Sequence, residues 1–159
     1  MTFLDFAIRF GVALGCGLVA SLPSRLAAQT LDLTLSPRVI TFPSSDPDAL
    51  PAVDAPPVTV TYRVRQNNAG PWSLTVLAGG DLISGPSKVD ISNVTWVATP
   101  APPFQNGTLS KTVAQRIASG TGNVPNPNTT GLITFRLANS WTYSTGTYTQ
   151  TVLFTLSAP

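Results

Sequence analysis

The sequence predicts an all-β fold, an antiparallel Greek-key β-sandwich of about 7–9 strands. Several short segments alternate apolar and polar residues, which is typical of strands with one buried and one exposed face. Fifteen prolines and twelve glycines interrupt the chain at short intervals, and this favours many short strands over long helices. The chain is 43% hydrophobic and only 10% charged, as expected for one compact domain.

Residues 1–28 have the composition of a signal peptide. Arg9 lies near the start, the apolar run Phe10–Ala20 follows, and small residues end the segment at 27–28. We expect cleavage after Ala28 and no membrane span in the mature chain, because a span needs about 20 apolar residues. A retained membrane anchor is the alternative. Cleavage would also remove Cys16, so we expect no disulfide.

Residues 29–42 form an N-terminal strand segment. Leu31, Leu33 and Leu35 alternate with polar residues, and the apolar stretch Val39–Phe42 follows. Pro37 separates the two halves and cannot donate a hydrogen bond to a β-ladder. The pattern therefore predicts one kinked strand or two short strands.

A Pro-rich stretch and a β-sandwich body follow. Residues 43–57 contain five prolines and no apolar period, so we expect an exposed loop or linker that acts as a hinge. Residues 58–159 form the body. Its clearest strand is Val58–Arg65, and the next strand, Trp72–Ala78, is expected to pair with it as a hairpin. We expect Trp72 and Trp96 to pack in the core.

The rest of the body follows the same pattern. Four further segments are predicted to be strands: Val89–Ala98, Leu109–Ile117, Leu132–Ala138 and Thr147–Leu156. The first has a bend or bulge at its centre. The second has two polar residues on its apolar face, and a short helical turn is the alternative there. A second long loop is expected over Gly120–Gly131, which is rich in Asn, Pro and Gly. In the last strand four large apolar residues share one face with Gln150: Tyr148, Val152, Phe154 and Leu156.

The residue inventory disfavours catalysis. The chain contains no histidine and no glutamate, and its one cysteine lies in the expected signal peptide, so the common nucleophile–base arrangements cannot form. We expect no enzyme activity, no cofactor and no metal. The alternative is calcium at Asp46 and Asp48, with Asp54 further along the chain, but no glycine-bearing ligand loop accompanies them. The basic residues do not cluster, so we expect no nucleic-acid partner.

The arrangement resembles bacterial pilus subunits that polymerise by donating an N-terminal strand. The resemblance rests on the signal peptide, the alternating leucines, the Pro-rich hinge and the C-terminal strand Tyr148–Leu156. It implies an Ig-like sandwich at the cell surface in a fimbrium. It also implies a donor strand carrying Leu31, Leu33 and Leu35 and an acceptor edge on the next subunit, whose residues would be Tyr148, Val152, Phe154 and Leu156.

Two segments are similar to WxL-type cell-surface domains. Trp72-Ser73-Leu74 has the Trp-x-Leu form, and the tail 151–159 resembles the end of that family, with Phe154 in place of a second tryptophan. The resemblance implies an association with the cell wall. Trp141 and Tyr143 lie in a predicted connection and are candidates for surface contact with a polysaccharide.

Two functions follow as expectations. The first is a secreted structural subunit of an extracellular filament or pilus, which joins copies of itself head to tail by β-strand addition. The second is a monomeric cell-wall or carbohydrate-binding module. The first predicts filaments that depend on the N-terminal strand, and the second predicts polysaccharide binding that depends on Trp141.

Overall fold

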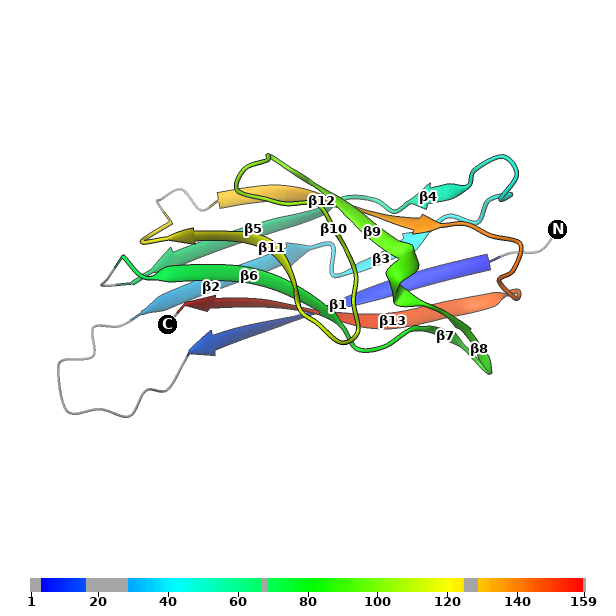
Figure 1. Ribbon diagram of the computed structural model, residues 1–159, viewed down its shortest axis with the longest axis horizontal. Helices are drawn as coiled ribbons and strands as arrows, with labels where there is room; N and C mark the ends of the chain where they lie inside the picture. The colour runs from blue at the N-terminus through cyan, green and yellow to red at the C-terminus, as the bar shows by residue number, and fades with distance from the viewer. Residues whose placement is uncertain (1–3, 17–28, 67–68, 125–128, 159) are drawn as a thin grey trace.

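Two β-sheets pack face to face and enclose an apolar core (Figure 1). The computed structural model describes residues 4–16, 29–66, 69–124 and 129–158. The prediction of an all-β sandwich is confirmed. The described residues form thirteen strands, more than the expected number, because several strands have only two to four residues and one lies within the expected signal peptide.

The first sheet contains the chain's C-terminal strand near its centre. Its order is β11 (Gln115–Thr121), β6 (Pro71–Ala78), β13 (Gly146–Ala158), β1 (Leu4–Cys16) and β3 (Val39–Phe42). The short strands β7 (Leu82–Ser84) and β8 (Ser87–Val89) extend it beside the start of β13. Among the described strands, β1 and β13 form the only parallel pair.

The second sheet is antiparallel throughout its described pairs. Its order is β10 (Gly107–Thr108), β9 (Val94–Thr99), β12 (Thr129–Ala138), β5 (Val58–Arg65) and β2 (Thr30–Ser36), and β4 (Ala52–Asp54) also pairs with β12. A single 3₁₀ turn, Ile91–Asn93, precedes β9. This turn, rather than a bulge, causes the change of phase expected near residue 92.

Strict alternation places one face of each long strand in the core. In β5 every second side chain from Val58 to Val64 is buried, and in β12 the same holds for Ile133, Phe135 and Leu137. Trp72 and Trp96 are buried as predicted. The N-terminal segment forms two short strands, β2 and β3, on either side of Pro37. This was one of the two predicted arrangements.

The predicted hairpin between β5 and β6 is wrong. The two strands follow one another in the chain but lie in opposite sheets, and β5 pairs with β12 and β2. Gln66, the residue after β5, is buried, and its side-chain amide donates to the carbonyls of Gly70 and Gly122. The alternation of buried and exposed residues in β5 and β6 fits either arrangement, because a hairpin within one sheet and two strands in facing sheets both cover the same core.

The Pro-rich stretch 43–57 is more ordered than a hinge. It contains β4, which pairs with β12, and Val53 and Ala55 are buried. The side-chain amide of Asn139 donates to the backbone carbonyls of Ser45 and Leu50 and to the hydroxyl of Ser45. The stretch is therefore fixed to the sandwich at both of its ends.

Strand boundaries between residues 107 and 131 also differ from the prediction. The strand expected over 109–117 begins only at Gln115 and continues to Thr121 as β11. Leu109 is buried without belonging to a strand. The loop expected over 120–131 is shortened at both ends by β11 and β12, and residues 125–128 lie outside the described part of the chain. Asn and Gly lower strand propensity, yet cross-strand pairing overrides this preference here.

Candidate strand-binding groove

Strand β1 lies between the two strands β13 and β3, and its removal would leave the space that we call the strand-binding groove. Strand β1 pairs in parallel with β13 along thirteen positions, from Leu4 beside Gly146 to Cys16 beside Ala158. On its other side it pairs antiparallel with β3, over Phe6–Arg9. In Figure 1, β1 and β13 run side by side through the sheet in the same direction. Without β1, β13 and β3 would each lose a neighbour, and the first sheet would be divided.

Two side chains anchor β1 in the core. Ile8 is fully buried, and only 8% of Phe10 is exposed. The ring of Phe10 stacks on Phe135 of β12 with centroids 5.4 Å apart and meets the edge of Phe154 of β13 at 5.3 Å. Such aromatic pairs contribute about 0.5–1.5 kcal/mol beyond the burial of their area. Phe10 therefore joins both sheets.

The packing of β1 becomes looser beyond Phe10. Val12 and Leu14 continue the same alternation, but 37% and 55% of these residues are exposed. The pairing with β3 also ends at Arg9, although the amide of Phe10 still donates to the carbonyl of Arg38 at 2.9 Å. One half of β1 is thus held by both neighbours and the core, and the other half mainly by β13.

The predicted acceptor residues line the strand that receives β1. All four are buried and point into the sandwich: Tyr148, Val152, Phe154 and Leu156. Their strand, β13, is not an edge in the described chain, because β6 pairs with one side of it and β1 with the other. An N-terminal strand does lie beside these residues. It is formed by residues 4–16 and not by the predicted donor.

The predicted donor residues lie in the other sheet. In β2, Leu31, Leu33 and Leu35 are opposite Val64, Tyr62 and Val60 of β5 in the same chain. Leu35 is buried, whereas Leu31 and Leu33 are half-buried against the core. Within one chain, the structure therefore does not bring the predicted donor to the predicted acceptor. Exchange between chains stays a prediction.

The sequence contained a signal for β1 that the signal-peptide prediction did not use. Large apolar residues occupy alternate positions: Leu4, Phe6, Ile8, Phe10, Val12 and Leu14. Between them lie only small or charged residues: Asp5, Ala7, Arg9, Gly11, Ala13 and Gly15. Alternation with this period indicates a strand, while mean hydropathy alone indicates an export segment. Cleavage after Ala28 stays a prediction, and residues 17–28 lie outside the described part of the chain.

The second predicted site lies at the loop before β13. There 65% of Trp141 is exposed, and its indole nitrogen donates to Asp48 Oδ1 at 3.1 Å. Tyr143 is half-buried against the core, and this burial raises the pKa of its phenol. Asp46 Oδ1 accepts the backbone amide of Asp48. Asp46 and Asp48, which were considered for calcium, thus make hydrogen bonds within the protein.

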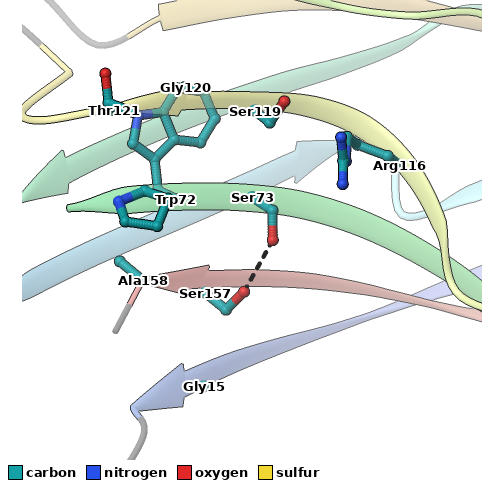
Figure 2. Close-up of a pocket in the computed structure, with 10 residues that line it drawn as sticks. Gly15, Trp72, Ser73, Arg116, Ser119, Gly120, Thr121, Ser157 and Ala158 are labelled. Atoms are coloured by element: carbon teal, nitrogen blue, oxygen red, sulfur yellow. Dashed lines mark hydrogen bonds between the residues drawn. The ribbon is translucent and has the colours of Figure 1, made fainter.

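A shallow depression, separate from the strand-binding groove, lies on the outer face of the first sheet where β11, β6, β13 and β1 run side by side (Figure 2). Ser119, Ser73 and Ser157 lie on one rung of this face, next to Gly15 of β1. The hydroxyls of Ser73 and Ser157 are 3.1 Å apart and hydrogen-bonded. Because Gly15 of β1 lines this depression, the shape of the depression depends on β1 being in place.

Several charged groups outside these sites form ion pairs at the surface. Arg136 donates to both carboxylate oxygens of Asp54, at 2.6 and 2.9 Å, and this hydrogen bonding lowers the pKa of Asp54. Lys111 donates to Asp81, also lowering that carboxyl's pKa. Pairs of this kind are screened by solvent and contribute little to stability. In the described ranges, no three acidic, cysteine or histidine side chains gather as metal ligands.

No protein-family model matches the chain, and no curated protein matches its sequence. None of the helical segments in the described part of the chain is long and apolar enough to cross a membrane.

Proposed function

We propose that this protein is an exported structural subunit of an extracellular filament, and that β-strand addition beside β13 joins successive copies. One observation carries the proposal: the first sheet is continuous only because a strand lies between β13 and β3, and that strand comes from the segment with the composition of a signal peptide. Removal of this segment would leave a groove of the length of a strand.

Without β1, the groove would offer an added strand both backbone hydrogen bonds and an apolar surface. Loss of β1 would leave one side of β13 with unpaired backbone groups, which favour another strand. It would also expose the core around Phe135 and Phe154, which Phe10 now covers. A neighbouring copy that supplies an alternating strand would restore both the ladder and the core.

The N-terminal strand of a neighbouring copy is the proposed donor. After cleavage at Ala28, β2 would begin within two residues of the new terminus, and it pairs only with β5 among the described strands. Its three leucines, Leu31, Leu33 and Leu35, have the alternation that the groove requires. Because β2 would first have to separate from β5, the net free energy of donation is the difference between its pairing with β13 of the neighbouring copy and its pairing with β5 of its own chain. Contacts of this head-to-tail kind do not close and build a fibre.

Leu33→Asp should abolish filaments and leave a folded monomer. Leu33 is half-buried on an edge strand, so the monomer tolerates a charge there better than the groove would. Negative-stain microscopy and size-exclusion chromatography of the exported protein measure the outcome. Thr34→Asp is the control, because this neighbouring side chain is exposed on the opposite face. Filaments of normal length in Leu33→Asp would rule out this donor.

The exposed indole of Trp141 favours a second candidate function, the binding of cell-wall polysaccharide. Its N–H is already bonded to Asp48, so its ring is held in place while most of its surface is free. Trp141→Ala should lower polysaccharide affinity about tenfold, which corresponds to ~1.4 kcal/mol. Pull-down on purified cell-wall polysaccharide measures this, with Val113→Ala as an exposed apolar control. Equal binding by both variants would exclude Trp141 as the contact.

A further inference from the structure

We infer that β1 is a built-in occupant of the groove, which keeps the groove closed to a second copy for as long as β1 is joined to β2. This inference rests on the proposed strand addition. It adds a regulatory step: the intact chain blocks its own acceptor strand, and a break between residues 16 and 29 makes it accessible.

The first argument is the completeness of the coverage. Each of the four predicted acceptor residues has a pairing partner on β1: Tyr148 with Phe6, Val152 with Phe10, Phe154 with Val12 and Leu156 with Leu14. The paired length extends over the whole of β13. An incoming strand therefore finds no free position on this side of β13 and must displace β1.

The second argument is the uneven hold on β1. The strand is held firmly at Ile8 and Phe10, which are buried, and less firmly at Val12 and Leu14, which are 37% and 55% exposed. Only its first half has a second neighbour, β3. A segment with two buried anchors is a modest ligand on its own, so its hold on the groove depends on its attachment to the chain.

The third argument is the effect of the covalent connection. A short connection between a strand and its groove gives an effective concentration of the order of millimolar. A donor strand on another copy, at micromolar concentration, competes poorly against this. Once the connection is cut, the separated strand dilutes into solution, and the donor competes on affinity alone.

The groove also defines the kind of strand that can replace β1. The replacement needs apolar side chains at alternate positions to cover Phe135 and Phe154. At the position of Gly11 a side chain would lie 3.1 Å from the Cδ1 atom of Leu153, a flexible group that can move. The groove therefore fits an alternating strand of a second copy, with β2 (Thr30–Ser36), which carries the predicted donor leucines, as the occupant.

The test uses the full chain with a specific protease site placed between residues 20 and 25. The chain is folded intact, and one half of the sample is then cut. A fluorescent peptide of residues 4–15 is added to both halves, and its uptake is followed by fluorescence anisotropy. We expect the cut protein to take up the peptide at least about tenfold faster. In the cut protein a dissociated β1 diffuses away, whereas in the intact chain it stays close to the groove and binds again.

A substitution gives an independent test without cutting. In the intact chain, Phe10→Ala removes the larger anchor and should raise the uptake of the wild-type peptide, whereas Arg9→Ala, on the exposed face, should leave it unchanged. Circular dichroism checks that each variant keeps its β-structure.

The outcomes separate this inference from the proposed function. Equal uptake of the peptide by the intact and the cut protein overturns the inference, and so does the formation of filaments by the intact protein to the same extent as by the cut protein. Faster uptake by the cut protein without any oligomer supports the inference and contradicts the filament function.

Discussion

Phe10→Ala should lower the free energy of unfolding of the full chain by about 3–5 kcal/mol. The ring of Phe10 is almost fully buried and contacts phenylalanines of both sheets, at centroid distances of 5.4 and 5.3 Å. Its removal leaves a cavity that the surrounding strands can fill only in part. Urea denaturation followed by tryptophan fluorescence measures the loss.

Val12→Ala is the matched control for Phe10→Ala. It lies two residues further along the same strand and is 37% exposed, so we expect a loss below about 1 kcal/mol. If the two variants unfold at the same urea concentration as the unsubstituted chain, β1 contributes nothing to the sandwich. The same pair also reports on processing, because a protein cleaved after Ala28 contains neither residue.

Gly131→Ala should be the second strongly destabilising substitution, with a loss of about 1–3 kcal/mol or more. Gly131 lies in β12 beside Val60 of β5, and a Cβ atom there would overlap the ring of Phe104. That ring is buried and packs edge-on against Tyr62 at 5.8 Å, so it has little room to move. Thermal unfolding measured by circular dichroism tests the effect.

Two further variants identify the cause of that loss. Gly15→Ala is the control, because its Cβ would lie 3.8 Å from the Cβ of Ser157, an ordinary contact, and it should change stability by less than about 0.5 kcal/mol. Phe104→Leu in the Gly131→Ala background should recover part of the loss, since contacting residues are energetically coupled. Strictly additive effects would show that the overlap with Phe104 is not the reason.

The candidate site was predictable in part. The apolar face of the last strand could be identified from its alternation, and the structure places Tyr148, Val152, Phe154 and Leu156 beside an N-terminal strand. Within the single chain β1 occupies this position, and Leu31 and Leu33 lie against β5, so donation of these leucines to a second copy stays a prediction. Both segments have the same period of two, so the pattern alone does not discriminate between them.

The sequence by itself determined the fold class and the buried face of each long strand. In β5 and β13 the alternation of side chains requires one buried and one exposed face, whichever strands lie beside them. Proline determined the break between β2 and β3 for an equally local reason, the missing N–H. These properties depend only on residues close in the chain.

Only the tertiary structure decided which strands are neighbours. It placed β5 and β6 in opposite sheets, paired β4 with β12, and inserted β1 between β13 and β3. Such pairings join residues that are far apart in the chain, as Phe10 of β1 and Val152 of β13 are, and their free energy comes from a shared core. Alternation of apolar and polar residues specifies a strand and its buried face. The neighbour of that strand is the segment whose side chains complete the shared core.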